Sequence, residues 1–252
     1  DPMTHAFQHG TASIKDSNGV VKRSIQLLAK ELGGLVSTHV GERPLTASMF
    51  DEVARIEELT KSALAFQRSL IADRMKEMPD FEFLENVADG GLEPVGLIPP
   101  YFYMTESSLS SWGTVNRRFI DAACNACKPE NVLAMVVVDS GILGDDELRK
   151  ELVEKLKVEG IGGYFIWVDD FSKHEASRAE LLGLVNLAKD LRSSSNQLIL
   201  NTHASYFSTA AAGIGKYAGL NGIMHGPEYG EARAVVPVGG GIPISRFYMP
   251  RL

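Results

Sequence analysis

The sequence predicts an α/β protein built as a single (β/α)8 barrel of the TIM type, with an open doubly wound parallel sheet as the alternative. The chain has 252 residues, of which 44% are hydrophobic and 23% are charged, which suits one barrel of about 250 residues with a sizeable core. Apolar strand-like runs alternate with longer amphipathic helices, as is typical of parallel sheets. No early G-x-G-x-x-G turn of the doubly wound kind is present.

Eight apolar runs are candidate strands, and their number favours closure into a barrel. The clearest is residues 131–138, a continuous apolar run of the kind expected for a strand buried on both faces. The eight candidates are residues 1–4, 35–38, 95–104, 131–138, 163–168, 197–200, 220–224 and 234–238.

The helices between these strands are predicted from apolar residues at helical spacing, as in residues 145–158. The other expected helices are residues 20–32, 51–77, 114–127, 173–192 and 206–216. We expect residues 1–252 to form one barrel domain, incomplete at its termini, with an inserted loop at 78–94. Because the chain begins with Asp1 rather than Met, we expect a fragment or a processed chain.

The composition argues against several function classes. A net charge of −7 argues against broad binding to nucleic-acid phosphates. No apolar run approaches the roughly 20 residues of a membrane helix, so no membrane partner is expected. Cys124 and Cys127 are too few for a disulfide framework, and we interpret their C-x-x-C spacing as an ordinary helix end. We therefore expect a cytoplasmic protein, with a homo-oligomer or a larger assembly left open.

The histidines locate the expected working face. In barrels, active sites lie on the loops that follow the carboxyl ends of the strands. All six histidines fall on or just after a predicted strand end, and none falls on the opposite face. They are His5, His9, His39, His174, His203 and His225.

Carboxylates at the same strand ends are the candidate catalytic groups. Asp139 follows one predicted strand, and Asp169-Asp170 follows the next. Adjacent residues of a strand point to opposite faces, so one of these two aspartates is expected to face the barrel mouth. Asp139 paired with Asp170 would carry out acid–base or nucleophilic chemistry on a glycosidic bond.

Histidines at the next two strand ends add a second possibility. His203 and His225 would act as general bases, or would bind a divalent metal ion together with Asp170. Glu228, in the polar loop after His225, is a further candidate acid.

Substrate-binding residues are expected at the same end of the barrel. Tyr103 is the aromatic side chain most suited to line the pocket, and Asn201 precedes His203 in the chain. Gly239, Gly240 and Gly241 let the backbone approach a ligand closely, and loops in this position of barrels frequently bind phosphate.

Asp139-Ser140-Gly141 resembles the D-S-G motif of tRNA-guanine transglycosylase barrels. The family motif continues with G-F-Q, whereas this chain continues with Ile142-Leu143-Gly144, and the family's cysteine-rich zinc site has no counterpart here. The resemblance covers three residues and implies glycosyl transfer.

These patterns predict a TIM-barrel enzyme that hydrolyses or transfers a glycosidic or other small-molecule substrate by Asp/His chemistry. A metal-dependent hydrolase is the close alternative. The remaining alternative is a non-catalytic barrel that serves as a binding or scaffold subunit, since a fold does not fix a function.

Overall fold

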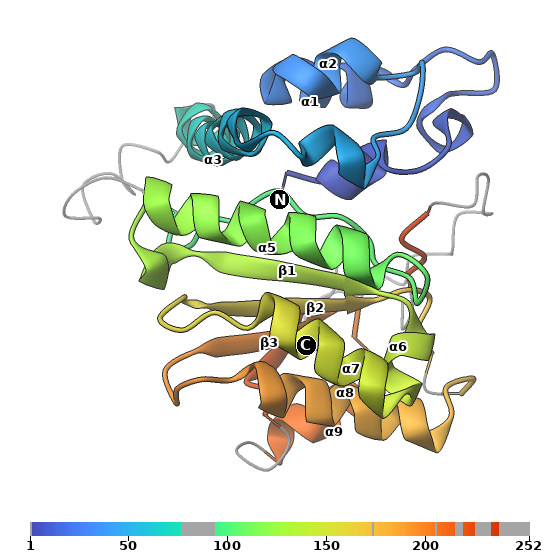
Figure 1. The fold of residues 1–252 in the computed structure, drawn as a ribbon, viewed down its shortest axis with the longest axis vertical. Coiled ribbons are helices and arrows are strands. Elements are labelled where there is room, and N and C mark those ends of the chain that lie inside the picture. Colours follow the sequence, from blue (N-terminus) through green and yellow to red (C-terminus); the bar gives the residue numbers. More distant parts are fainter. Residues whose placement is uncertain are drawn as a thin grey trace, which may run out of the picture.

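A parallel four-stranded sheet with the strand order β1-β2-β3-β4 organises the protein (Figure 1). The computed structural model describes residues 2–76, 94–172, 174–204, 206–214, 219–224 and 233–236. The strands are β1 (Leu133–Val138), β2 (Gly163–Val168), β3 (Leu198–Thr202) and β4 (Gly222–Met224). Neighbours in the sheet are also neighbours in the chain, so the strand order does not reverse within the described residues.

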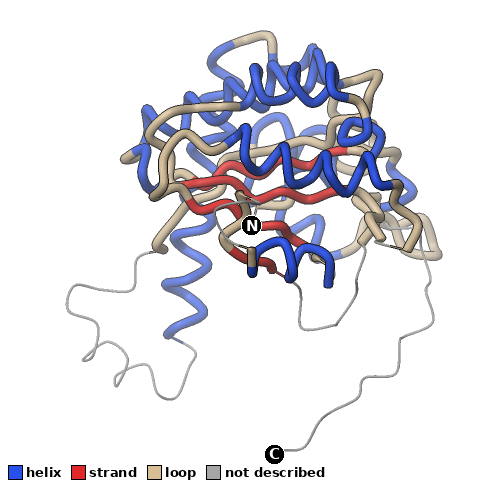
Figure 2. The backbone as a smooth tube through the Cα atoms, turned by 90° about the horizontal axis from the view of Figure 1, so that it is seen from below, coloured by secondary structure: helices blue, strands red, loops and turns tan. Residues whose placement is uncertain are grey.

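Helices follow the strands and pack along one face of the sheet. They are α5 (Leu109–Ala126), α6 (Ser140–Gly144), α7 (Asp146–Leu156), α8 (Arg178–Leu191) and α9 (Tyr206–Gly213). Helix α5 packs against α7, and α7 packs against α8. Right-handed crossovers that always advance in the same direction bring successive helices to the same face. Figure 2 shows the strands as adjacent red segments in the middle of the molecule.

The first part of the chain is helical and packs beyond α5. It contains the α-helices α1 (Arg23–Leu32), α2 (Gly34–His39) and α3 (Val53–Lys76) and the 3₁₀ helices η1 (Thr4–Phe7), η2 (Thr11–Ile14) and η3 (Ala47–Phe50). A further 3₁₀ helix, η4 (Pro129–Asn131), precedes β1. In Figure 1, α1 and α2 lie above α3, which packs against α5.

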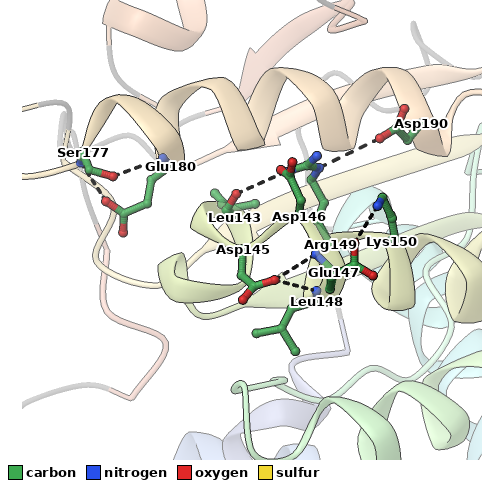
Figure 3. A network of polar contacts seen from close by, with 10 residues as sticks. All are labelled: Leu143, Asp145, Asp146, Glu147, Leu148, Arg149, Lys150, Ser177, Glu180 and Asp190. Atoms are coloured by element: carbon green, nitrogen blue, oxygen red, sulfur yellow. Dashed lines mark hydrogen bonds and ion pairs between the residues drawn. The ribbon is translucent and has the colours of Figure 1, made fainter.

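Polar side chains fix where α7 and α8 begin (Figure 3). The Asp145 carboxylate accepts hydrogen bonds from the backbone N–H groups of Glu147 and Leu148 in the first turn of α7. Ser177 and Glu180 form a reciprocal capping box at the start of α8. Such caps satisfy N–H groups that have no partner within the helix, each stabilising it by about 1 kcal/mol.

The sheet has two differently covered faces, because successive strand residues point to opposite sides. Val136 and Ile166 belong to the core beneath the helices. The opposite side, here called the aromatic face, is formed by Tyr101, Tyr103, Met135, Val137, Phe165 and Trp167. Residue Val235 packs against this face from late in the chain.

Residues 97–104 run beside β1 without forming a regular strand. They form isolated parallel bridges at Leu97, to Val132 just before β1, and at Met104, to Val138 at its end. Between these points lie Pro99 and Pro100, which lack the N–H groups of a continuous ladder. The predicted strand 95–104 therefore has the expected direction and neighbour but an interrupted ladder.

Side-chain amides take the place of the missing ladder on residues 97–104. The Gln67 carboxamide pairs with both backbone groups of Ile98, at 2.7 and 2.9 Å. The Asn116 carboxamide does the same for Phe102, with both distances 2.9 Å. Buried backbone groups need such partners, so these amides hold the segment in place.

Two predicted strands are helical instead. Residues 1–4 are not a strand: the described residues lead into η1, and Met3 has a left-handed φ of 45°. The Thr4 hydroxyl and the Gln8 carboxamide bond to the backbone of Tyr101 and Tyr103, so side chains rather than a strand satisfy this edge. The alternation of strands and helices later in the chain favours a strand there, but it does not extend to residues 2–4.

Residues 35–38 form part of α2. Ala29, Leu32 and Val36 are all buried at helical spacing, which continues the apolar stripe of α1 across Gly33-Gly34. The short apolar run was too brief to distinguish a strand from a buried helical turn.

A closed barrel of eight strands is not shown. The described part has four strands in an open arrangement, with residues 97–104 beside β1. Residues 233–236 form no strand, and the rest of the predicted strand 234–238 lies outside the described residues. Residues 78–93 of the expected inserted loop also lie outside them.

Candidate functional site

A tyrosine hydroxyl lies between two carboxylates at the carboxyl end of the sheet. The Tyr103 hydroxyl is 3.0 Å from Asp169 Oδ2 and 3.2 Å from Asp139 Oδ2. These residues come from three neighbouring chain segments, namely residues 97–104, the end of β1 and the end of β2. Ligands of open parallel sheets bind at this end of the strands.

Each carboxylate is held by a second hydrogen bond. Asp139 Oδ1 accepts from the Gly141 N–H at 2.8 Å and thereby caps α6. Asp169 Oδ1 accepts from the Val235 N–H at 2.6 Å. Both carboxylates are therefore fixed on one oxygen and face Tyr103 with the other.

Strand alternation explains why these aspartates meet. Val137 and Trp167 lie on the aromatic face, and Asp139 and Asp169 stand two positions further along the same strands. Burial is the main reason that the pKa of Tyr103 lies far above its ordinary value, and both carboxylates raise it further. Tyr103 therefore remains a hydrogen-bond donor at neutral pH.

Asp170 lies away from this pair. Its side chain is exposed, its φ is 43°, and its N–H donates to the Arg233 carbonyl oxygen at 3.1 Å. The structure thus places Asp169, and not the predicted Asp170, beside Asp139. Asp170 instead turns the chain after β2.

The imidazole of His5 is buried against the aromatic face. It stacks on Tyr101 with ring centroids 5.2 Å apart and meets the edge of Trp167 at 5.0 Å. Burial, followed by the charges of His9 and Arg233, lowers the pKa of His5 from 6.5 to about 3. His5 is only 4% exposed, and its Nδ1 atom has no hydrogen-bond partner among the described residues.

His9 and His203 are also close to this cluster. The His9 ring lies 5.9 Å from that of Tyr103, and the His203 ring lies 4.7 Å from that of Trp167. Burial lowers the pKa of both, to about 4 for His203, while Asp169 opposes the effect at His9. All three imidazoles are therefore neutral at pH 7.

Arg233 completes the described part of the site. Its guanidinium carbon lies 5.6 Å from the centre of the Trp167 ring, a cation–π arrangement. Its carbonyl oxygen accepts from Trp167 Nε1 at 3.1 Å. Neither residue is predicted as a site residue from the sequence, because an arginine in a polar loop and an aromatic residue in a strand carry no specific signal.

Asn201 serves a structural role away from this cluster. Its Nδ2 donates to the Ile166 carbonyl oxygen at 2.9 Å, and its Oδ1 accepts from the Ser208 hydroxyl at 2.6 Å. Asn201 thus links β3 to β2 and α9 rather than reaching the tyrosine and the two aspartates.

The backbone is strained around the site. Among the described non-glycine residues, a left-handed φ occurs at Met3, Asp170 and His203, and all three adjoin the cluster. Such conformations cost roughly 1–3 kcal/mol and concentrate at functional sites. Asp and His tolerate this region better than Met does.

Several predicted site residues lie outside the described residues: His225, Glu228, Gly239, Gly240 and Gly241. Within the described ranges, no group of three His, Cys, Asp or Glu side chains is arranged to hold a metal ion. The predicted metal ligands His203 and Asp170 are accordingly not joined there by a third ligand.

Of two cavities in the described part of the chain, the smaller borders the cluster and the larger does not. One of about 110 Å³ lies beside the cluster, between η1, Trp167 and Arg233. A larger one of about 640 Å³ lies between α3 and α5, and none of the residues that surround Tyr103 lines it. The smaller cavity is therefore the one that borders the cluster.

Cys124 and Cys127 are free and half-buried at the end of α5. The Cys127 thiol donates to the Ala123 carbonyl oxygen, and burial raises the pKa of both thiols. A raised pKa disfavours the reactive thiolate, in keeping with a helix end rather than a redox centre.

Comparisons of the chain with models of protein families, with curated proteins and with solved structures find no match. In the part of the chain that the structure describes, no helix is both long and apolar enough to cross a membrane.

Proposed function

We propose that the protein is an enzyme that cleaves or transfers a glycosidic bond with Asp139 and Asp169 as its carboxylate pair. The observation that carries this proposal is the Tyr103 hydroxyl, which lies within hydrogen-bond distance of an oxygen of each carboxylate and can donate to either. Two carboxyl groups flanking one substrate atom are the recurring machinery of glycoside hydrolysis.

The spacing of the carboxylates favours a covalent route. Since both Oδ2 atoms lie within hydrogen-bond distance of one hydroxyl oxygen, they lie at most about 6 Å apart. Retaining enzymes place the two carboxyl groups roughly 5–5.5 Å apart, whereas inverting enzymes leave roughly 6.5–9.5 Å for a water molecule. The shorter spacing supports nucleophilic attack by one carboxylate.

We assign the nucleophile to Asp139 and the acid–base role to Asp169. In the first step Asp139 forms a bond to the anomeric carbon while the bond to the leaving oxygen breaks, and protonated Asp169 gives its proton to that oxygen. In the second step Asp169 takes a proton from water or an acceptor hydroxyl, whose oxygen displaces Asp139. The charge of Asp169 also acts on the neighbouring His9, where it opposes the lowering of the imidazole pKa by burial.

The uniform strand order also supports a place for these strands in a larger barrel. Each βα unit in the described part adds its strand on the same side and its helix on the same face. A (β/α)8 barrel is built by repeating this step, with its active site at the carboxyl ends of the strands.

Intact-mass spectrometry with a panel of 2-fluoro glycosyl fluorides tests the assignment. These reagents accumulate the covalent intermediate, so the full chain should gain one glycosyl group and Asp139→Asn should gain none. Turnover of aryl glycosides should fall by roughly 10²–10⁴-fold in Asp169→Asn. The matched control is Asp170→Asn, which removes the adjacent exposed carboxylate and should retain turnover.

Two outcomes would contradict the proposal. Equal losses of turnover in Asp169→Asn and Asp170→Asn would contradict the assignment of the acid–base role to Asp169. If no glycoside in the panel reacts and no adduct forms, the result favours the alternative of a non-catalytic binding or scaffold subunit.

A further inference from the structure

The cavity beside Trp167 has a cationic lining. It measures about 110 Å³, and the described residues lining it include Lys22 and Arg233 but no aspartate or glutamate. A water molecule takes about 30 Å³, so the space holds one small ligand group or about four waters. The local charge thus opposes the chain's net charge of −7.

Neither cation is paired with a carboxylate of the described residues. Lys22 Nζ donates to the Ser13 carbonyl oxygen at 3.2 Å, and the Arg233 guanidinium lies over Trp167. An arginine that stacks on an aromatic ring keeps its planar edge of N–H donors available for an oxyanion.

Two residues that line the same cavity, His5 and His9, each carry a buried imidazole nitrogen without a partner. The two atoms are His5 Nδ1 and His9 Nε2, both buried and without a hydrogen bond within the described chain. An unsatisfied buried polar atom costs roughly 1–3 kcal/mol. A neutral imidazole has one N–H that either nitrogen can carry, so each unpaired atom can donate to a ligand oxygen.

We propose that this cavity binds a small oxyanion, a phosphate or carboxylate group, through Arg233, Lys22 and the imidazoles of His5 and His9. The anion would satisfy the two unpaired nitrogens and neutralise the two cations in one step. Its binding would be coupled to proton uptake, because an anion opposes the positive field of Arg233 acting on His5 and His203.

The position of the cavity connects it with the carboxylate pair. His9 lines the cavity and also feels the charge of Asp169. The substrate would accordingly be an anionic glycoside, with its phosphate or carboxylate group in the cavity and its scissile bond at Asp139 and Asp169. This choice of substrate rests on the proposed function, whereas the anion site itself does not.

Calorimetric titration of the full chain with inorganic phosphate at constant ionic strength tests the site. Arg233→Gln and Lys22→Gln should each weaken binding by about tenfold. The controls Arg178→Gln and Lys128→Gln make the same charge changes at exposed positions away from the cavity and should leave binding within about twofold. His5 and His203 NMR signals should titrate at higher pH when phosphate is present.

A wild-type chain that binds no phosphate, or equal weakening by Arg233→Gln and Arg178→Gln, would overturn the proposal. Inhibition of glycoside turnover then identifies the source of the anion: competition by phosphate indicates a substrate group, and inhibition without competition indicates a separate ligand.

The two proposals can fail separately. Phosphate binding without any glycoside turnover leaves the anion site standing and overturns only the carboxylate chemistry. Turnover that requires Asp139 and Asp169 but shows no phosphate binding overturns the anion site alone.

Discussion

The Gln8 carboxamide pairs with both backbone groups of Tyr103, accepting from its N–H and donating to its carbonyl oxygen, each at 2.7 Å. A side chain from the beginning of the chain thereby does what the next strand of a sheet would do. The tyrosine between Asp139 and Asp169 is positioned by this pairing.

Replacing Gln8 by Ala should therefore destabilise the protein. Both backbone groups of Tyr103 would lose their partner, at a cost of roughly 1–3 kcal/mol in the free energy of unfolding. Urea unfolding measures this. The control Gln26→Ala removes an exposed carboxamide that donates to the Val21 carbonyl oxygen, and its cost should stay below about 0.5 kcal/mol. Equal losses of unfolding free energy in Gln8→Ala and Gln26→Ala would show that the pairing with Tyr103 does not stabilise the fold.

The ionisation of Tyr103 should depend on its two carboxylates. Burial raises its pKa most, and Asp169 and Asp139 add to the effect. In Asp169→Asn one negative charge is removed, so the pKa of Tyr103 should fall. NMR of ¹³C-labelled tyrosine measures this, with Asp170→Asn as the control. An unchanged pKa in Asp169→Asn would contradict the observed contact.

His5 should make the protein sensitive to acid. Its pKa is about 3 in the folded chain and near 6.5 when exposed, so below about pH 6.5 the unfolded chain binds a proton that the folded chain does not. Stability therefore decreases as the pH falls through this window. Between about pH 7.5 and pH 5 the His5 contribution is about 2 kcal/mol.

The variant His5→Phe keeps a ring against Tyr101 and removes this titration. Its loss of unfolding free energy between the same two pH values should be smaller than that of the wild type by the His5 contribution. His174→Phe, which makes the same substitution at an exposed position, is the matched control. The same acid sensitivity in His5→Phe and in the wild type would sink this assignment.

Two glycine substitutions should have opposite effects. A Cβ on Gly183 of α8 would overlap the Leu143 carbonyl oxygen of α6, whereas one on Gly213 of α9 would meet nothing. Gly183→Ala should cost about 1–3 kcal/mol and displace α6, the helix capped by Asp139. Gly213→Ala should stabilise by up to about 1 kcal/mol. Thermal unfolding measures the stability of both variants. A change in stability of the same sign in both would contradict the close contact of α6 with α8.

The parts of the fold that were predictable are those whose own sequence is decisive. Strands β1 and β2 are continuous apolar runs, and α3 and α8 carry long amphipathic repeats; all four were predicted within a few residues of their bounds. The predicted strand 1–4 was wrong because this short segment takes its structure from a distant partner, and the pairing of Thr4 with Tyr101 leaves no local signal. The predicted strand 35–38 was wrong because so short an apolar run fits a buried helical turn as well as a strand.

The sequence indicates which end of the sheet carries the candidate residues but not which of their side chains meet. Apolar runs that end in Asp139 and Asp169-Asp170 predict carboxylates at the carboxyl end of the strands, and the structure has Asp139 and Asp169 side by side there. The choice between Asp169 and Asp170 depends on which face Trp167 occupies, and in a strand buried on both faces the alternation does not reveal this. His5 reaches the aromatic face through η1, an arrangement that no periodicity indicates.

The long reach of the N-terminal side chains has a consequence for how the protein is made. Thr4 and Gln8 bond to residues 97 and 95 positions further along the chain, and closing such a loop is slow compared with forming local contacts. During synthesis, η1 leaves the ribosome long before residues 101–103 and can dock only after they follow. Tyr103 can therefore take its place between the two aspartates only late in folding. Both Asp139 and Asp169 follow it in the chain, and they must be translated first.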